Sequence, residues 1–120
     1  MIKYSNKGSS RVVVLIGNYA IKIANPFFFH LHFLHGCYAN YSERYFYKQL
    51  QRIEKYETLQ LITPSLFCSY FGLVQIQRRC NELDRHLSVE EMERFKEVCH
   101  DLKKENFGYL EGNLVCFDYA

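Results

Sequence analysis

The sequence predicts an α+β fold, an antiparallel sheet with two main helices, in a single domain over residues 1–120. Three observations predict it. A β-branched run, Arg11–Ile16, is separated by a Gly-Asn turn signal from a second run at 19–23. Apolar residues at helical spacing follow at 40–56, and a hairpin pattern at 107–117 closes the chain. The expected order is β-β-α-β-β-α-β-β, and this chain length is sufficient to bury a core.

The first helix is predicted over residues 40–56, because four residues share one face: Glu43, Phe46, Leu50 and Ile53. That face should look towards the sheet and turn Glu43 inward. Lys22 lies on the strand at 19–23, where its neighbours Ile21 and Ile23 point to the opposite face. An inward Glu43 makes an ion pair with Lys22 possible.

The second half of the chain repeats the pattern of strands followed by a helix. Thr63-Pro64 breaks the chain, and residues 65–71 and 73–77 are predicted to be strands on either side of a glycine. Ser88-Val89-Glu90-Glu91 is a capping box that begins the second helix. Helical spacing of apolar residues continues to Leu102, so this helix either ends earlier or runs through Asp101.

Composition favours a cytoplasmic protein that does not act on nucleic acid. The net charge is +2 with acids and bases interspersed, and no basic stripe is evident. The five cysteines are odd in number and form no Cys-x-x-Cys pair, which indicates reduced, mostly buried thiols. The N-terminus lacks a secretory pattern, and the apolar stretch at 26–34 is too short to span a membrane. Ten Tyr and ten Phe exceed what a small core needs, so some are expected at a contact surface.

The C-terminal segment carries the residues with the clearest chemical meaning. Asp101 and Asn106 have the spacing Asp-x-x-x-x-Asn, a hairpin follows, and Asp118-Tyr119-Ala120 comes after it. This order resembles the catalytic and metal-binding segment of a protein kinase, in which a short hairpin leads to an Asp-Phe-Gly turn. The resemblance implies that Asp101 accepts the substrate proton and that Asn106 and Asp118 bind Mg²⁺.

The N-terminal half supplies the matching parts. The tetrapeptide ending at Lys22, Tyr-Ala-Ile-Lys, resembles the kinase Val-Ala-Ile-Lys, and Glu43 follows at a similar separation to the kinase helix glutamate. The position of the phosphate loop is held by Gly8, Ser9, Ser10 and Arg11, one glycine where kinases have three. Backbone N–H groups of such a turn can hold a phosphate, and an ordinary polar turn is the alternative.

The resemblance covers nearly the whole chain and implies a kinase-like small lobe with a reduced second lobe. It implies ATP and Mg²⁺ as cofactors, with Lys22 and Glu43 at the phosphates and Lys22 and Asp101 in catalysis. The chain is also similar to small uncharacterised proteins of phages and bacteria. That similarity rests on the residues Gly8, Ser9, Ser10, Arg11, Lys22, Asn40, Glu43, Asn106, Phe107, Gly108 and Asp118.

Departures from the kinase pattern leave alternatives open. Cys99 and His100 replace the His-Arg before the catalytic Asp, and no activation segment follows Asp118, so we expect phosphotransfer to be impaired. Lys22 could equally be a solvated strand residue, Glu43 a first-turn acid, Asn106 a turn cap and Asp118 an acid near the chain end.

A non-catalytic role is the second hypothesis. In it, a phage-borne kinase-like protein binds and inhibits a host protein or a defence complex. The partner would contact the aromatic segment of Phe27, Phe28, Phe29 and Phe33, a loop or short helix. The nearby His30, His32, His35 and Cys37 have side chains that zinc accepts, but partly buried imidazoles in an aromatic segment are the favoured interpretation.

Overall fold

The computed structural model describes residues 2–5, 10–26 and 30–119, of which 2–5 and 30 are described by their backbone alone. It confirms the α+β class with antiparallel sheets. The strands are β1 (Ile2–Ser5), β2 (Arg11–Ile16), β3 (Tyr19–Ala24), β4 (Ser65–Cys68), β5 (Val74–Arg78), β6 (Asn81–Glu82), β7 (Phe107–Leu110) and β8 (Asn113–Cys116). The helices are α1 (His30–Arg52), α2 (Tyr56–Leu59) and α3 (Val89–Phe95), with short 3-10 turns at Tyr70–Gly72 and Lys104–Asn106.

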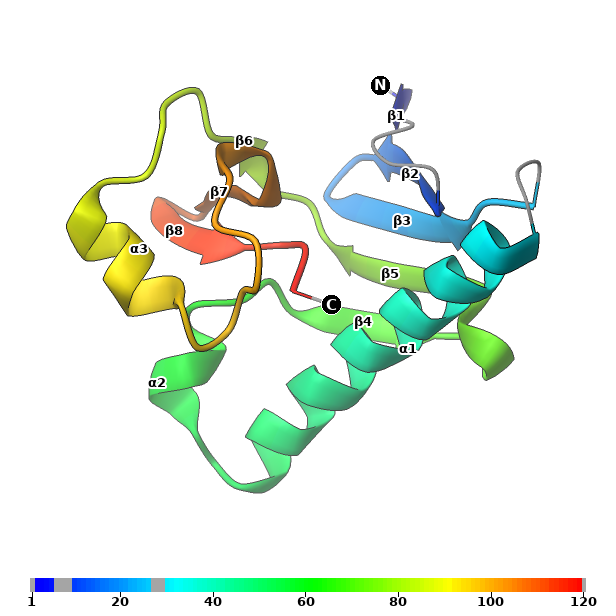
Figure 1. The fold of residues 1–120 in the computed structure, drawn as a ribbon, viewed down its shortest axis with the longest axis horizontal. Helices are drawn as coiled ribbons and strands as arrows, with labels where there is room; N and C mark the ends of the chain where they lie inside the picture. The colour runs from blue at the N-terminus through cyan, green and yellow to red at the C-terminus, as the bar shows by residue number, and fades with distance from the viewer. Residues whose placement is uncertain (1, 6–9, 27–29, 120) are drawn as a thin grey trace.

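The strands form two antiparallel sheets. The larger has the order β1-β2-β3-β5-β4, and the smaller the order β6-β7-β8. The predicted run Arg11–Ile16 pairs antiparallel with the following strand, with Val13 opposite Lys22. Figure 1 shows the two sheets side by side, with the segment after β8 running back between them. The described order contains β1, α2 and β6 in addition to the eight predicted elements.

Helix α1 differs from its prediction at both ends. It begins at His30 instead of residue 40 and ends at Arg52 instead of residue 56. Part of the aromatic segment, including Phe33, therefore lies on this helix, whereas residues 27–29 lie outside the described residues. The next change of direction comes at Glu54, whose φ of 57° is incompatible with a continuing helix. Glycine and aromatic residues, which have lower helix propensity, obscured the true start.

Helix α3 begins at the predicted capping box and is short. The Ser88 hydroxyl accepts a hydrogen bond from the Glu91 backbone, and the Glu91 carboxylate accepts one from the Ser88 backbone. The helix ends at Phe95, so Asp101 lies on a loop and the alternative of a helix through Leu102 is wrong. The strand predicted at 65–71 ends earlier, at Cys68 of β4, because Tyr70–Gly72 form the 3-10 turn; the strand predicted at 73–77 is β5.

The hydrophobic core lies beside the smaller sheet, away from most of the larger one. Phe95 of α3 meets Phe107 of β7 edge to face, with ring centroids 5.1 Å apart. One other member lies on α1 and two lie on β8, and the rest come from the segments that connect the elements or follow β8: Leu50, Ile62, Leu83, Leu87, Val98, Cys99, Leu114, Cys116 and Tyr119. This core holds the loop at 96–106 and the segment after β8 in place.

The larger sheet has an unusual polarity. The face that packs against α1 is polar and buried, and carries Arg11, Lys22, Ser65, Gln75 and Gln77. The opposite face carries β-branched residues that are mostly half-buried, such as Ile21 and Ile23. Because side chains alternate along a strand, these two sets are separated by the pleat. A charged layer between sheet and helix is therefore built into the fold, and it positions the site described next.

Among the described residues, no helix combines the length and the apolar character needed to cross a membrane.

Candidate functional site

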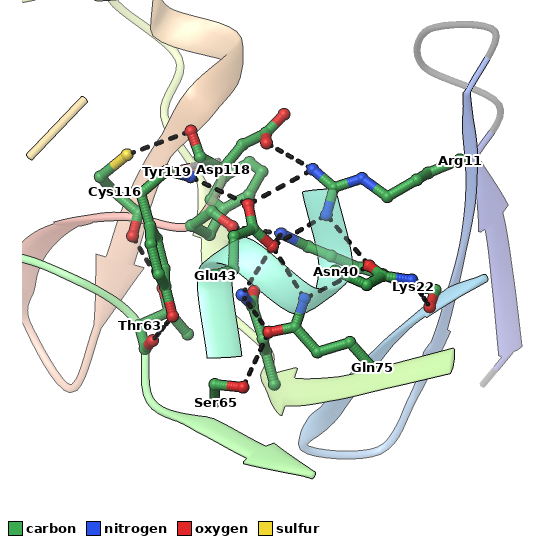
Figure 2. Close-up of polar contacts among 12 residues, drawn as sticks. Arg11, Lys22, Asn40, Glu43, Thr63, Ser65, Gln75, Cys116, Asp118 and Tyr119 are labelled. Carbon is green, nitrogen blue, oxygen red and sulfur yellow. Dashed lines mark hydrogen bonds and ion pairs between the residues drawn. The ribbon is translucent and has the colours of Figure 1, made fainter. Parts of the chain in front are cut away.

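A cavity of about 430 Å³ lies where the two sheets meet, and most of the predicted site residues line it. Its lining consists of Ser10, Arg11, Val13, Lys22, Lys103, Glu105, Asn106, Phe117 and Asp118. Of the predicted residues, Gly8 and Ser9 lie outside the described part of the chain, and Asp101 is not in the lining. Glu43 stands behind the cavity, where Figure 2 shows it at the centre of the polar contacts.

Glu43 is fully buried and accepts hydrogen bonds from four different segments. Its Oε1 lies 2.8 Å from Arg11 Nη1, 3.0 Å from Lys22 Nζ and 2.8 Å from Gln75 Nε2. Its Oε2 accepts from the backbone N–H of Tyr119 at 3.0 Å. Burial alone would raise the pKa of this carboxyl, but the charges of Arg11 and Lys22 outweigh it and hold the pKa well below its usual range.

Lys22 forms an ion pair with Glu43, the contact that an inward Glu43 makes possible. It is 3% exposed, so the alternative of a solvated strand lysine is wrong. The ammonium donates to Glu43 and also to the carbonyl oxygen of Phe117, the residue before Asp118. The Phe117 ring centroid lies 6.0 Å from Nζ. Lys22 therefore ties the larger sheet both to α1 and to the C-terminal segment.

Arg11 joins both carboxylates of the site. Nη1 donates to Glu43 and to Asn40 Oδ1, at 2.8 and 3.1 Å. Nη2 donates to Glu43 Oε2 at 3.3 Å and to Asp118 Oδ1 at 2.5 Å. Burial acts to lower the pKa of this guanidinium, but the two carboxylates raise it further above its already high value, so it stays charged. The terminal N–H groups are thus engaged by the protein itself.

The backbone beside Arg11 is fixed by a close approach of α1. A Cβ atom built on Gly36 would lie 2.1 Å from the Ser10 carbonyl oxygen, so only glycine fits there. The same oxygen accepts a hydrogen bond from the Asn25 backbone at 2.9 Å. Ser10, the described part of the predicted phosphate loop, is consequently held against the helix at the edge of the cavity.

Asn106 and Asp101 are connected in an unexpected way. Asn106 is buried, and its amide donates to the Asp101 backbone oxygen at 2.8 Å, which closes the loop between them. The Asp101 carboxylate points elsewhere: its side chain is 63% exposed and pairs with Lys103 at 3.3 Å. Asn106 thus holds the loop through the backbone of Asp101, five residues earlier, while the Asp101 carboxylate lies outside the cavity lining.

Sequence reasoning assigned no contact in the network to Asn40, Gln75, Gln77 or Tyr119, although Asn40 was among the residues shared with small phage and bacterial proteins. Asn40 donates to the backbone of Lys22 and Gly72, and Gln75 and Gln77 both donate to Glu43. Tyr119 is buried and its hydroxyl donates to the Thr63 carbonyl at 2.9 Å. The signal was present in Val-Gln-Ile-Gln-Arg, where glutamines alternate with β-branched residues and share the face of Lys22.

The site does not fit a Mg²⁺ ion at Asp118 as its side chains lie. Carboxylate and amide oxygens are suitable magnesium ligands, and Asp118 and Asn106 both line the cavity. However, the Asp118 Oδ1 is held by the Arg11 guanidinium, which is itself fixed by Glu43 and Asn40. A metal at this carboxylate would lie beside a fixed positive charge. For the zinc alternative, no group of three or more suitable side chains gathers among the described residues.

Comparison of the chain with protein-family models, with curated proteins and with solved structures finds no match.

Proposed function

We propose that this protein is a kinase-like nucleotide-binding protein that takes ATP in the cavity between its two sheets and is impaired in phosphoryl transfer. One observation carries the proposal. Side chains from separate parts of the chain, among them Ser10, Lys22, Asn106 and Asp118, converge on one cavity of about 430 Å³. That volume falls within the usual range of small-molecule sites, about 300–1,000 Å³.

The phosphates would lie near Lys22. Its ammonium has three hydrogens, and the two described acceptors are Glu43 and the Phe117 carbonyl, so a third is open to a ligand oxygen. Lys103 lines the same cavity and adds a second, exposed cation. Ser10 lines it as well, at the end of the predicted phosphate loop.

The nucleobase would enter an adjoining apolar slot. Val13, Lys22 and Phe117 line both the main cavity and a smaller one of about 70 Å³, to which Leu15 and Ala20 also contribute. Buried Gln77 faces this slot, and its Oε1 has no hydrogen-bond partner among the described residues. An exocyclic amine of a base would satisfy that acceptor. Because the slot is small, the Phe117 ring must shift to admit a base.

Phosphoryl transfer is the weaker part of the resemblance. A general base must reach the proton that it abstracts, within hydrogen-bond distance or through one water. The Asp101 carboxylate is exposed, ion-paired to Lys103 and outside the cavity lining. We therefore assign it no part in catalysis.

The test is a calorimetric titration of the protein with ATP and, separately, with adenosine. Binding of ATP that is at least about tenfold tighter than binding of adenosine supports a phosphate site. Lys22→Met should lose this preference, and its folding is verified by circular dichroism. Lys96→Met is the matched control, because Lys96 pairs with Glu93 on the exposed surface of α3 and the turn that follows it. The absence of ATP binding at millimolar concentration would refute the proposal.

A second candidate function, binding of a protein partner, is favoured by an exposed aromatic surface. Tyr70 and Phe71 are 91% and 85% exposed at the turn between β4 and β5. With Tyr41, Arg44 and Phe67 they line an open hollow of about 550 Å³. Aromatic anchors beside an arginine are typical of interface hot spots. This surface is distinct from the Phe27–Phe33 segment predicted for the role, in which the described Phe33 is half-buried.

A further inference from the structure

The guanidinium of Arg11 links the two carboxylates of the candidate site, Glu43 and Asp118. It lies 2.5 Å from Asp118 Oδ1 and 2.8 Å from Glu43 Oε1. Arg11 itself is buried, so this charge is screened little by solvent. The arrangement already brings positive charge to the carboxylate that would otherwise bind a metal.

The charges of the set are balanced without a metal. Arg11 and Lys22 supply two positive charges, and Glu43 and Asp118 supply two negative ones, all linked by direct contacts. A dication added at Asp118 would leave an excess of positive charge next to a fixed guanidinium, which is unfavourable. Conversely, an Asp118 carboxylate neutralised by Arg11 repels an approaching phosphate less than a free one does.

Arg11 cannot readily leave this position. Its terminal N–H groups bond Glu43, Asn40 and Asp118, and its strand is locked in register with Ala24 opposite. The preceding residue, Ser10, is pressed against Gly36 of α1. A swing of the guanidinium away from Asp118 would leave buried Glu43 with one cation fewer, which is costly in a buried site.

We propose that the cavity binds its nucleotide as the metal-free anion, with Arg11 in the electrostatic place of the metal. This inference rests on the proposed function and adds to it the form in which the ligand is bound. The phosphates then face Lys22 and Lys103 directly, and Asp118 acts as a partner of Arg11. The ligand class is a nucleoside polyphosphate that is not complexed to a divalent ion.

The test is a titration of the whole protein with ATP in a buffer containing EDTA and in one containing excess Mg²⁺. We expect the affinity in EDTA to equal or exceed that in Mg²⁺. Tightening of more than about threefold in Mg²⁺ would overturn the inference and leave the proposed nucleotide binding intact. Failure to bind ATP in either buffer would refute the proposed function, and this inference with it.

The variant Asp118→Asn distinguishes a carboxylate that pairs with Arg11 from one that binds a metal, because the two roles predict opposite changes in ATP affinity. The side chain is 41% exposed, and asparagine keeps its shape and an acceptor for Arg11, so the variant is expected to fold. Without the negative charge, ATP in EDTA should bind about two- to tenfold tighter, because one repulsive charge near the phosphates is gone. If Asp118 is instead a metal ligand, the variant binds more weakly in Mg²⁺. Either that weakening or an unchanged affinity would contradict the proposal.

Discussion

The guanidinium of Arg11 lies 2.5 Å from the carboxylate of Asp118, although 107 residues separate them in the chain. The contact joins the first residue of β2 to the segment that follows β8, and so connects the larger sheet to the smaller one. Glu43 reinforces the connection, because it binds Arg11 on one side and the Tyr119 backbone on the other. The candidate site is therefore also the junction of the two halves of the fold.

Glu43→Gln should destabilise the protein strongly. The substitution leaves Arg11 and Lys22 buried without the carboxylate that compensates them, and removal of one partner from a buried pair costs about 3–5 kcal/mol. Urea unfolding followed by circular dichroism measures the loss. Glu93→Gln is the control, since it breaks an exposed pair with Lys96 and should cost less than about 1 kcal/mol. Equal losses in the two variants would contradict a structural role for the buried network.

Stability should fall in acid through the same carboxyl. The folded-state pKa of Glu43 lies below its ordinary value of about 4.5, so its contribution is complete above that pH and is lost as the pH falls towards the folded-state pKa. The difference in unfolding free energy between the wild type and Glu43→Gln should be constant from pH 7 to about pH 5 and then shrink by up to about 1.4 kcal/mol per pH unit. A difference that is constant down to pH 3 would argue against this linkage.

Gly36→Ala should destabilise the protein, although the same change in an open helix position stabilises by up to about 1 kcal/mol. The added methyl group would lie 2.1 Å from the Ser10 carbonyl, so α1 must move away from the start of β2. We expect a loss of about 1–3 kcal/mol, typical of overpacking, and weaker ATP binding because Arg11 follows Ser10. Denaturant unfolding and calorimetry provide the two readouts. Ala39→Gly, on the same helix, should cost only the usual helix propensity.

Asp101→Asn should leave both stability and ATP affinity nearly unchanged. Its carboxylate is exposed and, among the described residues, pairs with exposed Lys103, a contact worth less than about 1 kcal/mol. The backbone oxygen that binds Asn106 is retained in the variant. Asn106→Ala is the informative comparison, because it removes the amide that closes the loop. A tenfold or larger change in ATP affinity for Asp101→Asn would restore a role for this carboxylate.

Phe71→Gly should stabilise the protein by about 0.5–1 kcal/mol. Phe71 adopts a φ of 62°, a left-handed conformation that glycine tolerates better, and its ring is almost fully exposed. Tyr70→Gly is the matched control, since Tyr70 is equally exposed but is not among the described residues with positive φ. A gain for Phe71→Gly would show that the aromatic ring is retained at a cost to stability, as a residue kept for binding would be.

The strands and caps of this fold could be predicted from local sequence, whereas the start of α1 could not. The run at Arg11–Ile16 and the capping box at Ser88 are short-range signals that tertiary contacts did not override. Helix α1 begins in an aromatic segment with weak propensity, and its helical state depends on packing that includes Gly36 against Ser10. Periodicity located the helix but could not locate its first turn.

Most residues of the candidate site could be named from the sequence, but most of the contacts between them could not. The inward face of the predicted helix made the ion pair of Glu43 with Lys22 possible. The Arg11 bridge to Asp118 could not be predicted, because a contact across 107 residues depends on how the two sheets meet. The spacing of Asp101 and Asn106 did not reveal that their contact runs through the Asp101 backbone, while the Asp101 carboxylate is exposed and pairs with Lys103.

The polar inner face of the larger sheet also bears on how the chain avoids mispairing. A slip of β3 by one residue would turn Lys22 to the outer face and place Ile21 or Ile23 beneath Glu43. In most sheets such an error exchanges apolar for polar residues and is penalised by exposed hydrophobic area. Here the slip would leave the buried Glu43 carboxylate without Lys22, and an unpaired buried charge costs more free energy than the exposed apolar area does. The charged layer thus favours the native register of β3 over registers shifted by one residue during folding.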